Sequence, residues 1–276
     1  MRILASFPTL PNCARLSQSF FPAQPTTTRN AMTSASVIYS RAKGPVNINP
    51  KTLVDSLNTL TSNRHGVAVI RQNEEILKWH SKRGKEEGKL TYDSPAALEL
   101  SSQLCSIVRS VDPGRSLGEH RLMSVIHRDT TPKATIAESE DHGTFSGTAS
   151  DVHRDLDEHA VSNLRSKGEV GWYNIWMPLK PITDDPLGFV SPATVNVEVE
   201  STGFMGIGSG VTDRTGLVYS DLHEWYLAQD MKVGDALIWR SEVVYHAAIR
   251  GLGDGKGRRS VDFRLAFRGV DDTVPE

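Results

Sequence analysis

The sequence predicts a mainly β fold with flanking helices (α+β), in which a single barrel accounts for most of the chain. Two observations predict it. Helical apolar patterns gather before residue 112, whereas short aromatic and β-branched runs bounded by Gly, Pro and Asp follow one another from residue 121 onward. Residues 37–276 also have a suitable length, because barrels of roughly 200–250 residues commonly form one domain.

The composition is that of an ordinary soluble protein, with 38% hydrophobic and 23% charged residues. A net charge of −2 argues against a nucleic-acid surface, which needs a concentrated basic excess. No stretch approaches the ~20 consecutive apolar residues of a membrane span. The two cysteines, Cys13 and Cys105, exclude a disulfide framework and a Cys-based zinc site. We therefore expect an intracellular protein with neither a nucleic-acid partner nor a membrane span.

Residues 1–36 form a leader that we exclude from the fold. No Asp or Glu precedes Asp55, while Ser, Thr and Arg recur. This composition is typical of an organelle transit peptide and predicts a plastid or mitochondrial location. A disordered tail, or a true start at Met32, is the alternative and implies a cytoplasmic protein.

Apolar spacing predicts two long helices, over residues 50–63 and 94–111. In the first, Asn49 is the expected N-cap, because Pro50 suits a first helical position that needs no N–H. A short charged helix is expected over 157–166. The apolar positions that define the two long helices are Leu53, Leu57 and Leu60, then Leu98, Leu100, Leu104 and Ile107.

The most strand-like segment is 170–177, which is rich in aromatic and β-branched residues. Strand alternation places Trp172, Asn174 and Trp176 on one face. The segment 201–216 contains five glycines and is predicted to be either a mobile lid or a flexible surface loop. The other expected strands are 67–70, 121–127, 187–190, 223–227, 233–239, 242–249 and 260–267.

A metal site is predicted by His153-Arg154-Asp155 together with His246, 93 residues further on. On a strand, His153 and Asp155 point to one face and Arg154 points away. Two His and one carboxylate occupy one face of a six-coordinate iron and leave three positions open. A double-stranded β-helix (jelly-roll) barrel presents its iron in this way, with the distant His supplied by a second strand.

The chain contains a competing His-x-Asp motif, His127-Arg128-Asp129. We favour 153 and 155 because a polar, loop-like segment leads to them and the aromatic strand 170–177 follows them. The alternative for either motif is a surface or capping His beside a solvated Asp. For His246, which follows an apolar run, the alternative is a hydrogen-bonded core histidine.

A cosubstrate site is predicted by Arg258-x-Ser260, 12 residues after His246. A guanidinium suits a carboxylate inside a mostly apolar barrel, because its forked donors match the two oxygens. Arg264 lies on the same strand face and is the second candidate. A protein-kinase catalytic loop at His153-Arg154-Asp155 is excluded, since such a loop needs Asn five residues after the Asp and position 160 is Ala.

The chain resembles the fungal gibberellin-desaturase-like and cephem-methoxylation-type oxygenases, a branch of the Fe(II)/2-oxoglutarate enzymes. The resemblance covers roughly residues 67–267 and departs from the group at Met177, where a basic residue is expected. Residues 234–239 are also similar to the phytanoyl-type hydroxylases. The motifs that carry the main resemblance are Val152-His-x-Asp155, Tyr173-Asn-Ile-Trp-Met-Pro178, Asp185-Pro-Leu187, Trp225-Tyr226 and Arg258-x-Ser-Val261.

This resemblance implies a jelly-roll dioxygenase, an oxidoreductase that uses Fe(II), 2-oxoglutarate and O2. Its substrate would be a small natural product, changed at a C–H bond by hydroxylation, desaturation or oxidative cyclisation. Candidate substrate contacts are Trp172, Asn174, Trp176 and Arg240. Two alternatives remain open: an iron enzyme of the same fold that does not use 2-oxoglutarate, and a non-catalytic accessory barrel.

Overall fold

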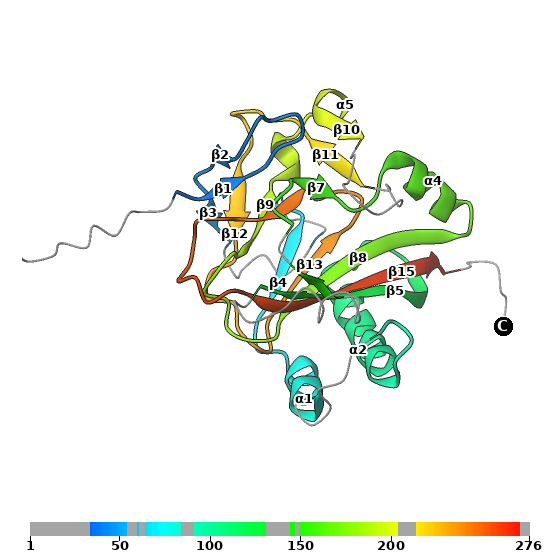
Figure 1. Cartoon of the computed structure of the whole chain (residues 1–276). Coiled ribbons are helices and arrows are strands. Elements are labelled where there is room, and N and C mark those ends of the chain that lie inside the picture. The colour runs from blue at the N-terminus through cyan, green and yellow to red at the C-terminus, as the bar shows by residue number, and fades with distance from the viewer. Residues whose placement is uncertain are drawn as a thin grey trace, which may run out of the picture. The chain divides into compact units, whose positions relative to one another are not determined.

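The computed structural model describes residues 34–53, 60, 64–83, 91–130, 144–146, 149–203 and 214–270. In this part of the chain, two large β-sheets form a double-stranded β-helix, which confirms the predicted mainly β fold (Figure 1). A small two-stranded sheet joins β1 (Ser36–Val37) to β2 (Val46–Asn47).

The first large sheet runs in the order β10-β11-β7-β14-β9-β12-β3. These strands are β10 (Ser201–Gly203), β11 (Thr215–Leu217), β7 (His153–Arg154), β14 (His246–Ala248), β9 (Leu187–Val190), β12 (Trp225–Leu227) and β3 (Lys51–Thr52). The second sheet runs in the order β4-β13-β8-β15-β5-β6. Its strands are β4 (Val67–Ile70), β13 (Ala236–Arg240), β8 (Glu169–Pro178), β15 (Arg259–Gly269), β5 (Leu117–Asp129) and β6 (Thr144–Ser146).

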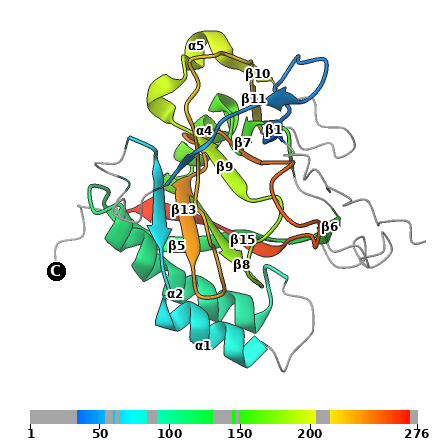
Figure 2. The ribbon, with the colours of Figure 1, turned by 90° about the vertical axis from the view of Figure 1, so that its left-hand side faces the viewer.

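Helices α1 (Glu74–Arg83) and α2 (Pro95–Val111) cover the outer face of the second sheet, below β8, β15 and β5 in Figures 1 and 2. Helix α2 begins at Ser94, whose hydroxyl caps the Ala97 N–H. Leu98 is 48% exposed rather than buried, because the stripe that faces the sheet carries Leu100, Leu104 and Cys105. The shorter helices are α4 (Glu158–Arg165), α5 (Val197–Glu200) and the 3-10 turn η1 (Pro192–Thr194).

The two faces of strand β8 point to different regions, one to the apolar core beneath α2 and the other to the space between the two sheets. Tyr173, Ile175 and Met177 pack in the apolar cluster that contains the α2 residues. The opposite face carries Trp172, Asn174 and Trp176. Each indole packs in a separate apolar cluster, and Asn174 donates a hydrogen bond to Asp155. The predicted alternation is therefore confirmed, and it sends Asn174 and Trp176 toward the space between the two sheets.

The predicted helix over 50–63 is wrong at its start. Lys51–Thr52 forms β3, which pairs in parallel with Tyr226 and Leu227 of β12. Pairing with a neighbouring strand overrides the helical spacing of the leucines here. Residues 54–59 and 61–63 lie outside the described part of the chain.

Several other expectations also fall outside the described residues. They are the transit peptide before residue 34, the loop residues 131–143 and 147–148, and the lid residues 204–213. The last residues of the predicted leader do belong to the fold, since Ala35 is buried and Ser36 pairs with Asn47. None of the described helices is long and apolar enough to cross a bilayer.

Candidate metal centre and its pocket

Strands β7 and β14 bring His153 and His246 together. The two residues are directly opposed in the antiparallel register, and their ring centroids are 4.5 Å apart. Asp155 follows β7 and is held by its backbone N–H, which donates to the Ser241 carbonyl. One ligand atom from each of the three side chains lies within 4.8 Å of the others, and all three residues are buried. No other His, Cys, Asp or Glu cluster of this kind occurs among the described residues.

Both imidazoles are oriented by the backbone. Nδ1 of His153 lies 2.7 Å from the Asp151 carbonyl, and Nδ1 of His246 lies 3.3 Å from the Val244 carbonyl. A carbonyl can only accept, so each Nδ1 carries the proton and each Nε2 is the unprotonated nitrogen of its ring. Burial lowers the pKa of both rings, that of His246 to about 4, so both are neutral at pH 7. A neutral imidazole with a fixed tautomer is the form that ligates a metal.

The third group, Asp155, is held at both carboxylate oxygens. Arg264 Nη2 donates to Oδ1 at 2.6 Å, and Asn174 Nδ2 donates to Oδ2 at 2.6 Å. The Ser241 hydroxyl in turn donates to Asn174 Oδ1. Burial alone would raise the pKa of Asp155, but the charge of Arg264, with smaller contributions from the imidazoles and Arg214, holds it well below its usual range. The carboxylate is therefore ionised and fixed in orientation.

The distances between these groups suit one shared ion. Asp155 Oδ1 lies 3.7 Å from His153 Nε2, and Asp155 Oδ2 lies 3.6 Å from His246 Nε2. Imidazole nitrogens and carboxylate oxygens bind zinc-like divalent metals at about 2.0–2.2 Å, which puts neighbouring ligands roughly 3 Å apart. Side-chain shifts of a few tenths of an ångström would close the difference.

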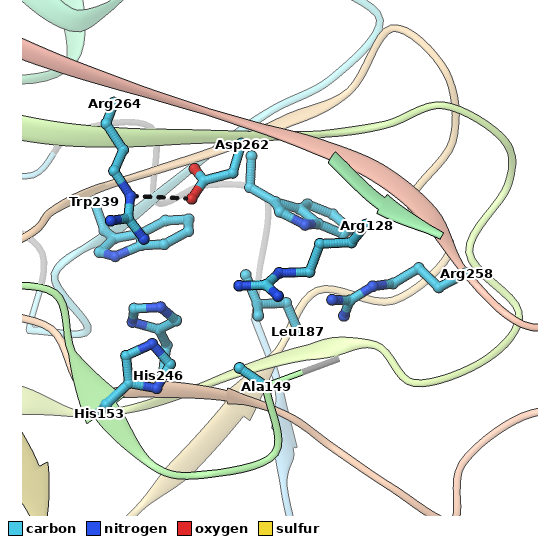
Figure 3. A pocket seen from close by; sticks show the side chains of 10 residues that line it. Arg128, Ala149, His153, Leu187, Trp239, His246, Arg258, Asp262 and Arg264 are labelled. Atoms are coloured by element: carbon cyan, nitrogen blue, oxygen red, sulfur yellow. Dashed lines mark ion pairs between the residues drawn. The ribbon is translucent and has the colours of Figure 1, made fainter. Parts of the chain in front are cut away.

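A pocket extends from the two imidazoles to a pair of arginines (Figure 3). The described residues that line it are Arg128, Ala149, His153, Trp176, Leu187, Trp239, His246, Arg258, Asp262 and Arg264. In Figure 3 the guanidinium groups of Arg128 and Arg258 lie on the side away from the imidazoles. The pocket thus has a metal-ligand end and a cationic end.

Arg258 is only 1% exposed. Its Nη1 donates to the Asp185 carbonyl at 2.6 Å, and its guanidinium carbon lies 5.6 Å from the centre of the Trp176 ring. Burial, followed by the charge of Arg128, lowers the pKa of Arg258 to about 9. The side chain remains a cation at pH 7.

Several buried polar atoms around the pocket make no hydrogen bond within the described part of the chain. Such atoms are uncommon in folded proteins, and they indicate a missing polar partner. Their location near the pocket suits a bound group with several oxygens. They are Arg258 Nε, Ser260 Oγ, Asp262 Oδ1, Arg264 Nε, Trp176 Nε1 and Trp239 Nε1.

Asp262 is the carboxyl group that lines the pocket between the two ends. Its Oδ2 lies 3.4 Å from Asn174 Nδ2 and 3.5 Å from Arg264 Nε. Burial raises its pKa to about 7, although Arg264 and Arg128 act in the opposite direction. Asp262 is thus only partly ionised at neutral pH.

The remaining predicted site residues are placed as follows. Trp172 packs near α4 and donates to Glu169 Oε2 at 2.9 Å, outside the pocket. Arg240 pairs in register with Tyr173, on the outer face of the sheet, and its Nε lies 3.9 Å from Asp112 Oδ2. Arg264 contacts Asp155 rather than lying beside Arg258. Neither Trp172 nor Arg240 is therefore part of the site that we describe.

Two arginines near the site were missed by sequence reasoning. Arg214 Nε lies 3.7 Å from Asp155 Oδ1 and belongs to the end of the expected lid. Arg128 lines the pocket from β5. The signal that could have identified Arg128 is strand alternation, which separates it from His127 and Asp129 on either side.

Comparison with known proteins gives a structural match without a sequence match. No protein-family model and no curated protein matches the sequence. A variant of the iron and alpha-ketoglutarate-dependent endoperoxidase NvfI matches with a TM-score of 0.59 and 19% identity, over 82% of this chain and 84% of that one. The same endoperoxidase in a different conformation matches with a TM-score of 0.60 and 17% identity, over 82% and 86%. At these identities the likeness establishes the fold.

Proposed function

We propose that this chain is an Fe(II)- and 2-oxoglutarate-dependent oxygenase that acts on a C–H bond of a small molecule. The observation that carries the proposal is one buried pocket with two complementary ends. A His–Asp–His cluster lies at one end and a buried arginine at the other. The endoperoxidase with the same fold uses iron and alpha-ketoglutarate, another name for 2-oxoglutarate, which supports the same pair of cofactors here.

His153, Asp155 and His246 would hold the iron, with three positions left open for 2-oxoglutarate and O2. When bound, iron with 2-oxoglutarate and O2 would supply the oxidant that attacks the substrate C–H bond, and 2-oxoglutarate would be converted to succinate and CO2. The protein positions the reactants. Asn174 and Arg264 fix the Asp155 carboxylate. The centre of the Trp239 ring lies 4.9 Å from the centre of the His246 ring, and this indole helps to exclude water from the site.

Arg258 would bind the far carboxylate of 2-oxoglutarate, with the Ser260 hydroxyl as a further donor. Arg258 has an unsatisfied Nε and Ser260 has an unsatisfied Oγ. Both residues precede Arg264 on the same strand face, and Arg264 is already engaged by Asp155. This arrangement favours Arg258 over Arg264 as the anchor.

The substrate is expected to be a small natural product. Trp176 lines the pocket and Asn174 contacts both Asp155 and Asp262, so these two remain the substrate-proximal candidates. Hydroxylation, desaturation and oxidative cyclisation are all compatible with one iron site, because they share the C–H cleavage step.

Two measurements on the whole protein test this function. Anaerobic Fe(II) and 2-oxoglutarate should give the weak visible charge-transfer band of the chelate, and admission of O2 should then give succinate. His153→Ala and His246→Ala should abolish the band, while His127→Ala should retain it. Iron binding without the band would indicate an iron enzyme that does not use 2-oxoglutarate. Failure to bind iron would indicate a non-catalytic barrel.

A further inference from the structure

Asp262 and Asp155 share two neighbouring side chains, Asn174 and Arg264, but they are hydrogen-bonded to a different degree. Each oxygen of Asp155 accepts a hydrogen bond at 2.6 Å, one from Arg264 and one from Asn174. Asp262 Oδ2 lies 3.5 Å from Arg264 and 3.4 Å from Asn174. Asp262 Oδ1 is buried and has no hydrogen-bond partner within the described part of the chain. Asp262 therefore carries an open acceptor.

This open oxygen belongs to a side chain that lines the pocket and is only 7% exposed. In Figure 3 Asp262 lies on β15 between Arg264 and Arg128. Burial raises the pKa of Asp262 to about 7, although the two arginines act in the opposite direction. A further donor would favour the ionised form, because a hydrogen bond to the charged group stabilises it. A buried oxygen without a donor indicates a missing partner.

The iron and the cosubstrate of the proposed function do not supply this partner. At neutral pH 2-oxoglutarate carries two carboxylates and a ketone, whose oxygens only accept hydrogen bonds. It can satisfy unpaired N–H groups around the pocket, but not a carboxylate oxygen. A donor for Asp262 has to come from another molecule, and the substrate is the one that the proposed reaction still requires.

The register of β15 and β8 places an open donor beside this open acceptor. Asp262 and Trp176 are directly opposed in the antiparallel pair, so both side chains leave the sheet on the same face. Trp176 also lines the pocket, and its buried Nε1 makes no hydrogen bond among the residues that the structure describes. An indole N–H can only donate. One face of the sheet thus offers an acceptor and a donor from neighbouring positions.

A hydroxyl group fits this pair, because it donates one hydrogen bond and accepts others. An ammonium group only donates and a ketone only accepts, so each would satisfy one member of the pair. Asp262 already lies in the field of Arg264 and Arg128, which lower its pKa, so it does not require a cationic partner. The site therefore suits a neutral group that both donates and accepts.

We propose that Asp262 is a specificity-determining residue, which selects a substrate that carries a neutral hydroxyl group. The hydroxyl donates to Asp262 Oδ1 and accepts from Trp176 Nε1, and these two contacts orient the substrate in the pocket. This inference rests on the proposed function and names its substrate class, a small molecule that is already hydroxylated.

Two probes with the same carbon ring test the proposal. Cyclohexanol donates and accepts, whereas cyclohexanone only accepts. Each is titrated anaerobically into the complex of the protein with Fe(II) and 2-oxoglutarate, and calorimetry gives its dissociation constant. The wild-type protein should bind cyclohexanol roughly 10-fold more tightly, the usual effect of a hydrogen bond to a charged group.

Asp262→Leu removes the acceptor and should abolish this preference. It should weaken cyclohexanol binding roughly 10-fold and change cyclohexanone binding by less than about threefold, within the usual tolerance for independent sites. Asp262→Asn keeps the shape and one acceptor without the charge, so it should retain a preference of about threefold. Trp176→Phe removes a donor that both probes can use, so it should weaken both and keep the preference.

Asp129→Leu is the matched control. Asp129 is also a carboxylate on a strand of the second sheet, but it pairs with Arg259 at 2.9 Å, on the side away from the pocket. This variant should leave both dissociation constants unchanged. The charge-transfer band verifies the metal and cosubstrate sites, and Asp262→Leu should change the dissociation constant of 2-oxoglutarate by less than about threefold.

The outcomes separate this inference from the proposed function. Weaker 2-oxoglutarate binding in Asp262→Leu would assign Asp262 to the cosubstrate. Equal affinity of the wild type for the two probes would leave only a water at Oδ1, and binding of neither would show that no substrate hydroxyl reaches it. Each result would overturn the inference, while the proposed function would survive. Absence of the band in the wild-type protein would overturn both.

Discussion

The triplet His-Arg-Asp occurs twice on strands of this barrel, and the two copies are used in opposite ways. In the copy that begins on β7, His153 and Asp155 point toward His246, while Arg154 turns away to contact Glu158 and the Glu242 carbonyl. In the copy on β5, Arg128 faces the pocket. Asp129 lies on the outer side, where it pairs with Arg259.

Strand phase, rather than residue composition, therefore decides which side chains of a His-Arg-Asp triplet face the pocket. Side chains alternate with a period of two, so a one-residue change of phase exchanges the residues on the two faces. The phase is set by pairing with a neighbouring strand. His153 is directly opposed to His246 on β14, whereas Arg128 is directly opposed to Ser260 on β15.

The largest contrast is expected between the two aspartates. Asp155→Asn removes an ionised ligand and should lower Co(II) or Fe(II) affinity more than about 100-fold, while Asp129→Asn should leave it within about twofold. Metal titration of both variants measures the contrast. A comparable loss in the two variants would mean that phase does not distinguish the motifs.

The next largest effect on metal affinity is expected from Arg264, which donates a hydrogen bond to Asp155. Arg264→Ala should lower metal affinity roughly 10- to 100-fold, as outer-sphere changes typically do. Arg264 lowers the pKa of Asp155, so its loss raises that pKa and protons compete better with the metal. The deficit should therefore grow as the pH falls from about 7 to about 5. A deficit that stays constant across this range would contradict the electrostatic role.

A third effect separates the two faces of β8. The Tyr173 hydroxyl donates to Asp112 Oδ2 at 2.9 Å on the outer face, beside α2. Tyr173→Phe leaves a buried carboxylate oxygen without this donor and should reduce the free energy of unfolding by about 1–3 kcal/mol. Denaturant unfolding measures this loss, and metal titration of the same variant should give the wild-type affinity. A loss of metal affinity would show that the two faces are coupled.

The smallest effect is expected at the ion pair between Asp129 and Arg259. The Arg259 side chain is 52% exposed, and pairs at such sites contribute little. Arg259→Gln should change the free energy of unfolding by less than about 1 kcal/mol. A larger loss in a denaturant titration would show that the outer side of β5 has more than a surface role.

Much of this architecture is predictable from local sequence. Helix α2, strand β9 and the phase of β8 follow from apolar spacing, capping and aromatic alternation, which are short-range signals. The convergence of His153, Asp155 and His246, which the structure shows, was predictable because a two-His, one-carboxylate iron site needs those residue types at compatible strand positions.

The rest depends on pairing between distant segments. Strand alternation separates Arg128 from His127 and Asp129, but only the β5–β15 register, which opposes Arg128 to Ser260, puts Arg128 on the same face as Arg258. Lys51 and Thr52 become a strand because β12, more than 170 residues away, pairs with them. The outward position of Arg240 likewise follows from its pairing with Tyr173.

Diffraction from crystals soaked anaerobically with Fe(II), measured at the iron absorption edge, would locate the metal in the barrel. We expect one strong anomalous peak bonded to His153, Asp155 and His246, at the pocket end opposite Arg258. A peak beside His127 and Asp129, or full iron loading with none at the three predicted ligands, would contradict this expectation.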